Sequence, residues 1–186
     1  QGGGKPPALF YLPCTVFHLL GCGTPGRAKI EGLVESGALG YTAPMTLYTL
    51  IDHTADLGIE ITGRTKKELF TKALWSLMDI LIVREAPLKS AKSRKQKSLT
   101  VEGSDTADLL INFLREILYL VNGKAFIIGT CEITECGSKK LATRLWLEPY
   151  NRKKHAIKTE VKAVTYHGLN VEKTKSGWKA RVIFDV

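Results

Sequence analysis

The fold is decided first by residues 57–81, which read LGIEITGRTKKELFTKALWSLMDIL. At the start of this segment Leu57, Ile59 and Ile61 alternate with polar or small residues, as in a strand with one buried face. The capping box Thr65–Glu68 follows, in which the Thr hydroxyl and the Glu carboxylate satisfy free amides at a helix start. Apolar residues then recur at helical spacing. We therefore expect a strand, a turn and a helix that ends near residue 81.

A second helix is predicted further along the chain. Ser104 or Asp105 caps its start, apolar residues between 109 and 121 line one face, and Gly123 follows its end. Strands are expected at residues 47–51, 57–61, 98–102, 125–135, 140–148, 156–167, 168–172 and 178–185. Short turns between several of them favour antiparallel hairpins. The pattern predicts an α+β fold in which two main helices pack on a largely antiparallel or mixed sheet.

Residues 1–44 form a different kind of sequence, rich in Gly and Pro and without a sustained period. Met45 directly precedes the first predicted strand. We interpret residues 1–44 as a poorly structured N-terminal extension or a start-site artefact, followed by one domain at 45–186. The apolar run at residues 8–20 allows a removed signal peptide as a second interpretation, although it is too short to span a bilayer. No transmembrane helix is predicted.

Composition limits the classes of partner. The chain has 27 Lys and Arg against 18 Asp and Glu, a net charge of +9, which is consistent with RNA or with a partner that handles RNA. Its cysteines do not form a zinc-binding pattern, because no CxxC is present. Cys131 and Cys136 are five residues apart, a spacing that puts their side chains on opposite faces of a regular strand. A reducing cytoplasm is the expected location.

An acidic loop, Asp52-His53-Thr54-Ala55-Asp56, separates the first two predicted strands. Aspartates are common in loops because they bond local amides, and His53 would serve equally as a hydrogen-bonded structural residue, a general base or a metal ligand. The loop pattern by itself favours the structural interpretation for these residues.

The sequence Val182-Ile183-Phe184-Asp185-Val186 shifts that balance. Alternation places Phe184 on the buried face of the last strand and Asp185 on the other, beside the carboxylate of Val186. If the acidic loop lies alongside, several anionic oxygens meet, and a hard cation such as Ca²⁺ or Mg²⁺ would hold them together. Pairing of Asp185 with a lysine or arginine is the alternative, and the residues leave the two equal.

Other chemistry has little support. The chain has no GxGxxG, GxxxxGK[ST], GxSxG or HExxH motif, and no arrangement of nucleophile, base and orienting group. The sequence therefore favours a protein that is not an enzyme.

Three separated motifs resemble the archease family. They are residues 50–56 (LIDHTAD), residues 160–169 (EVKAVTYHGL) and residues 182–186 (VIFDV), with Gly177-Trp178 just before the last. The helix at Leu110–Tyr119 is similar to the family's pattern as well. The resemblance covers residues 45–186 and none of residues 1–44.

The resemblance implies a non-enzymatic activator of an RtcB-type RNA ligase. Such an activator promotes guanylylation of the ligase and its multiple turnover in tRNA splicing and RNA repair, with any contact to RNA being indirect. It also implies a divalent-metal site, usually calcium, whose ligands here would be Asp56, Asp185 and Val186. Asp52 and His53 would be neighbours of that ion, either contacting its ligands or having a functional role beside it.

Two further classes of function stay open. The net charge allows an RNA-binding or chaperone module that has no dedicated ligase partner, and salt-sensitive RNA binding without a ligase would favour it. A metal-dependent hydrolase is the least favoured class, and phosphoester turnover by the purified chain with Mg²⁺ or Mn²⁺ would support it.

Overall fold

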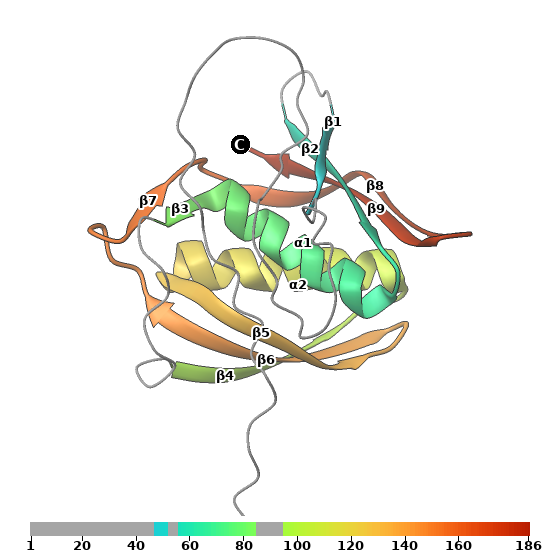
Figure 1. The fold of residues 1–186 in the computed structure, drawn as a ribbon, viewed down its shortest axis with the longest axis horizontal. Helices are drawn as coiled ribbons and strands as arrows, with labels where there is room; N and C mark the ends of the chain where they lie inside the picture. Colours follow the sequence, from blue (N-terminus) through green and yellow to red (C-terminus); the bar gives the residue numbers. More distant parts are fainter. Residues whose placement is uncertain (1–46, 52–55, 85–94) are drawn as a thin grey trace, which may run out of the picture.

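Two helices lie between two antiparallel sheets (Figure 1). The structure, a computed structural model, describes residues 47–51, 56–84 and 95–186. One sheet has the order β1-β2-β9-β8 and the other β4-β6-β5. The α+β class with two main helices is confirmed. The predicted single sheet is in fact divided in two, so that each helix contacts a sheet on both sides.

The four-stranded sheet carries both ends of the described chain. Its strands are β1 (Thr49–Ile51), β2 (Leu57–Gly63), β8 (Ala163–Thr174) and β9 (Gly177–Asp185). All of its neighbouring strands run antiparallel. In β9 the alternation predicted from sequence holds, because Ala180, Val182 and Phe184 are fully buried against the helices.

The second sheet closes the other side of the helices. It contains β4 (Lys95–Glu102), β5 (Phe126–Cys136) and β6 (Lys140–Pro149), which pair antiparallel. A small two-stranded ladder of β3 (Ile82–Arg84) and β7 (His155–Ile157) lies at one end of the molecule (Figure 1).

The helices begin where their caps predict. Helix α1 spans Lys66–Leu81, and the Thr65 side chain accepts a hydrogen bond from the Glu68 amide. Helix α2 spans Thr106–Leu118 and is capped by Asp105, which accepts hydrogen bonds from two amides of the first turn. A π-helical turn, η2 (Tyr119–Gly123), extends α2. Among the described residues no helix is long and apolar enough to cross a membrane.

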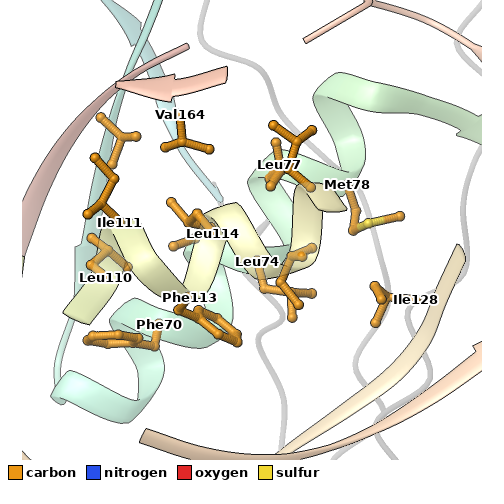
Figure 2. Packing of buried hydrophobic residues seen from close by; sticks show 14 of the residues in the cluster. Phe70, Leu74, Leu77, Met78, Leu110, Ile111, Phe113, Leu114, Ile128 and Val164 are labelled. Carbon is orange, nitrogen blue, oxygen red and sulfur yellow. The ribbon is translucent and has the colours of Figure 1, made fainter. Parts of the chain in front are cut away.

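The core fills the space between the two sheets. Phe70 of α1 and Phe113 of α2 meet with ring centroids 6.0 Å apart, and Figure 2 shows Leu110, Ile111 and Leu114 in the same cluster. Ile111 is fully buried although it does not lie on the predicted apolar face of α2. Its burial is explained by the two-sided contact, since a helix between two sheets has little surface left for water.

Two predicted strand boundaries were wrong. The expected strand 156–167 is interrupted, because β7 ends at Ile157 and β8 begins at Ala163. The expected break at Gly168 is instead a bulge inside β8, where the register shifts between Thr165 and Asn170. Strand β3 was not predicted at all. Its three residues follow α1 directly, without a turn signal between them.

The prediction that Cys131 and Cys136 point to opposite faces was also wrong. Cys131 pairs with Leu145 and Cys136 with Leu141, and a register shift between Ile133 and Glu135 adds one residue between them. Both cysteines therefore pack against the core. Burial raises the pKa of both thiols, that of Cys131 to about 12, which favours their protonated form.

Candidate functional site

The pairing of β2 with β9 brings two of the predicted site residues to one place. Leu57 is the partner of Phe184, so Asp56, which precedes Leu57, and Asp185, which follows Phe184, come next at the same end of this antiparallel pair. Directly opposed residues of an antiparallel pair have their Cβ atoms about 5 Å apart. The strand register thus carries Asp56 to the strand end that holds Asp185, although 128 residues separate them in sequence.

The last residue of β9 is bound by the segment that leads into β8. The Lys162 amide donates to the Asp185 carbonyl oxygen at 2.8 Å, and the Lys162 ammonium donates to the main-chain oxygen of Val186 at 2.9 Å. We call Asp56, Lys162, Asp185 and Val186 the chain-end corner. The end of β9 pairs with β2 on one side and with β8 on the other, so the backbone that carries these oxygen atoms is held in place.

The alternative role for Asp185 was a salt bridge to a basic side chain. Among the described residues, no salt bridge joins a lysine or arginine to the Asp185 carboxylate. The amide of Lys162 bonds the main chain of Asp185, but the Lys162 ammonium donates its hydrogen bond to Val186 instead. Asp185 is half-buried and Val186 is 37% exposed, so the corner remains open to a ligand from solvent.

Part of the predicted site lies outside the described residues. Asp52 and His53, the expected neighbours of the ion, belong to residues 52–55, and their expected role stays a prediction. Within the described ranges, no three His, Cys, Asp or Glu side chains gather to hold a metal ion. The predicted ligand set has only two such side chains, and its third member is the main chain of Val186.

The outward face of β9 next to the corner is covered, which the sequence did not indicate. Ile183 shares that face with Asp185 but is only 3% exposed. The bulge in β8 lies over it, and a Cβ at Gly168, where φ is +60°, would come 2.7 Å from the Ile183 side chain. The positive φ and this close approach together require glycine. They give a physical reason for Gly168 in the second family motif.

A second polar cluster joins α2 to the same bulge. The Tyr166 hydroxyl donates to the Asp108 carboxylate, and the Arg115 guanidinium lies 4.7 Å from the centre of the Tyr166 ring. The hydrogen bond from Tyr166, followed by that from the Ser104 amide, lowers the pKa of Asp108. The same bond raises the pKa of Tyr166. Arg115 also donates to the Val164 carbonyl oxygen at 3.1 Å, so the cluster fixes β8 against α2.

Sequence reasoning missed this cluster because its members are far apart in the chain. Tyr166 appeared only within the motif at residues 160–169, and Asp108 and Arg115 look like ordinary polar helix residues. Their spacing of seven residues places both on one side of α2, which was the available signal.

Comparison with known proteins gives the family of the chain. The family model described as the archease protein family matches residues 48–186. A protein named archease from Methanosarcina barkeri is 29% identical over 143 residues, which cover 75% of this chain and 95% of the relative. The archease of Pyrococcus furiosus is 31% identical over 139 residues, covering 73% of this chain and 95% of the relative.

A solved structure shares the fold. The solution structure of protein 1598 of Methanobacterium thermoautotrophicum superposes with a TM-score of 0.58 at 26% sequence identity. The match covers 76% of this chain and all of that one. The matched region of the family model ends at Val186 and therefore includes the whole chain-end corner.

Proposed function

The chain belongs to the archease family, and we propose that it activates an RtcB-type RNA ligase through a divalent ion held at the chain-end corner. In this proposal it has no catalytic residues of its own. It promotes guanylylation and multiple turnover of the ligase in tRNA splicing and RNA repair. The observation that supports the proposal is the register of β2 with β9, in which Leu57 pairs with Phe184, so that Asp56 and Asp185 follow at the same end of the two strands.

The chemistry of the corner fits a hard cation. The carboxylates of Asp56 and Asp185 and the main-chain oxygen of Val186 are oxygen ligands, which Ca²⁺ takes in sets of six to eight. Three protein residues would leave other coordination positions of the ion for water and for a ligand from the partner. Calcium is the proposed ion, because a ligand set from a strand end and a loop is tolerated better by its flexible geometry than by octahedral Mg²⁺.

The residues of the corner have separate tasks in this proposal. Asp56 and Asp185 would bind the ion, while the Lys162 ammonium fixes the orientation of Val186 and offsets part of the negative charge. A bound divalent ion supplies positive charge that can stabilise phosphate oxygens during nucleotidyl transfer. The corner lies at the end of a sheet and is partly exposed, so a partner protein can reach it.

Reconstitution tests the proposal. The chain is mixed with its cognate ligase, an RNA with a 3′-phosphate or 2′,3′-cyclic phosphate and GTP, and guanylylation is followed over several turnovers. We expect Asp56→Asn and Asp185→Asn to abolish the stimulation, while Glu172→Gln, an exposed carboxylate elsewhere on β8, keeps it. Stimulation by both aspartate variants at the wild-type level would refute a role for the corner.

The alternative, an RNA-binding or chaperone module without a dedicated ligase, gives a different result in the same experiment. The wild-type chain would then bind RNA but leave the guanylylation rate of the ligase unchanged.

A further inference from the structure

A surface hollow lies next to the chain-end corner and shares one residue with it. Its volume is about 490 Å³, and it is formed by the end of α2, by η2 and by the segment entering β8. The residues that line it are Arg115, Leu118, Tyr119, Asn122, Gly123, Lys162, Ala163 and Val164. Lys162 belongs to both places, because its ammonium donates to Val186. The lining is thus largely apolar, and Arg115, Asn122 and Lys162 are its polar side chains.

Two exposed tyrosines accompany this hollow. Tyr119, which lines it, is 51% exposed, and Tyr166, whose ring is held by the lining residue Arg115, is 52% exposed. Each ring has a cation near one face, since Lys124 lies 5.4 Å from the centre of the Tyr119 ring. An exposed tyrosine adds little to the core. Here both rings are instead oriented by neighbouring side chains.

The charge around the rings is mixed. Arg115, Lys124 and Lys162 contribute three positive charges. The carboxylates of Asp108 and Glu116, which lie on α2 like Arg115, contribute two negative charges. Such a surface would bind a polyanion through a few phosphate contacts, with much of the affinity supplied by stacking. Proteins that bind single-stranded nucleic acid combine cationic groups with aromatic rings in this way.

We propose that this hollow binds single-stranded RNA directly, with bases stacked on Tyr119 and Tyr166 and phosphates contacted by Arg115 and Lys162. A duplex does not fit the proposal, because its bases are already stacked and cannot reach the two rings. The volume is in the range that accommodates one small ligand such as a nucleotide. The proposal goes beyond activation of a ligase, which needs no RNA contact by this chain.

The position of the hollow suggests what bound RNA would do. Because Lys162 lies between the hollow and Val186, an RNA strand held on the tyrosines would have its backbone near the chain-end corner. This chain would then contribute to the placement of an RNA strand as well as to activation of the protein partner.

The test is direct binding without any ligase. Fluorescence anisotropy is measured with the full chain and a labelled single-stranded RNA of about ten nucleotides. A duplex RNA and free GMP serve as competitors. Single-stranded RNA should compete well and duplex RNA and GMP poorly. The plot of log affinity against log salt should have a slope of about −1.4, as expected for two phosphate contacts on a single strand.

Variants locate the site. Tyr119→Ala and Tyr166→Ala should each weaken binding at least fivefold, roughly the loss of one stacked base, while Tyr119→Phe keeps the ring and the affinity. Arg115→Gln should weaken binding as well. Lys153→Gln, an exposed cation in the turn before β7, is the matched control and should not. Circular dichroism shows that each variant is folded.

Three results would overturn the proposal. They are wild-type affinity of both tyrosine-to-alanine variants, equal competition by duplex RNA, and equal weakening by Lys153→Gln, which would indicate general attraction to a basic surface. None of them bears on ligase activation, which is measured separately with Asp185→Asn.

Discussion

The helical layer and the chain-end corner are built in opposite ways. Between the sheets Phe70, Phe113 and Leu114 are fully buried, and stability there comes from apolar area removed from water. At the corner Asp56, Lys162, Asp185 and Val186 lie at strand ends, half-buried or exposed. The first region keeps the sheets together. The second brings carboxylate and main-chain oxygen atoms to the end of a sheet, as the proposed ion site requires.

The largest effect is expected in the helical layer. Phe113→Ala removes a fully buried ring that contacts Phe70, and it should lower the free energy of unfolding by about 3–5 kcal/mol, through lost transfer energy and the cavity that remains. Urea unfolding measures it. Ile157→Ala is the control, since that side chain is 66% exposed and its loss should cost about 0.5 kcal/mol or less. Similar losses for both variants would contradict the described core.

A smaller effect is expected where the bulge covers β9. Gly168→Ala adds a Cβ at a positive φ and 2.7 Å from Ile183, and it should cost about 1–3 kcal/mol. The double variant Gly168→Ala with Ile183→Ala separates the two causes. The double variant should lose less free energy of unfolding than the sum of the two single variants, because the clash is removed. The backbone strain at residue 168, about 1 kcal/mol, should remain. Additive losses would show that the clash is absent.

The smallest effect on stability is expected at the corner. In the presence of a chelator, Asp185→Asn should change the free energy of unfolding by about 0.5 kcal/mol or less, because it removes one of several like charges at an accessible place. Thermal unfolding at low and high salt measures this. A loss of several kcal/mol without any ion would mean that Asp185 has a structural role.

Sequence patterns predicted the elements better than their assembly. The capping box at Thr65–Glu68 and the cap at Asp105 are local, so both helix starts could be read directly. The division into two sheets could not, because strand order depends on contacts between distant residues. The full burial of Ile111 in α2 is a consequence of this division into two sheets.

The bulges were also beyond the reach of the sequence. The alternation rule assumes a regular strand, and one extra residue near Thr134 reversed the expected relation of Cys131 and Cys136. In β8 the residue that marks the irregularity, Gly168, was visible, but it was interpreted as a strand break. A glycine within a strand pattern indicates a bulge as readily as an end.

Only part of the candidate site was predictable from the sequence. The family motifs named Asp56, Asp185 and Val186, and the alternation in β9 placed Asp185 away from the core. Their proximity required the register of β2 with β9. The hollow beside η2 had no sequence signal, since its lining comes from residues 115–123 and 162–164, which are far apart in the chain.

The central claim is that Asp56, Asp185 and Val186 share one divalent ion. Isothermal titration of the chelator-treated chain with Ca²⁺ tests it most directly. The account predicts that the wild-type chain binds about one Ca²⁺ per chain. This binding should be lost in both Asp56→Asn and Asp185→Asn and kept in Glu172→Gln. Undiminished Ca²⁺ binding by the two aspartate variants, or no binding by the wild-type chain, would contradict it.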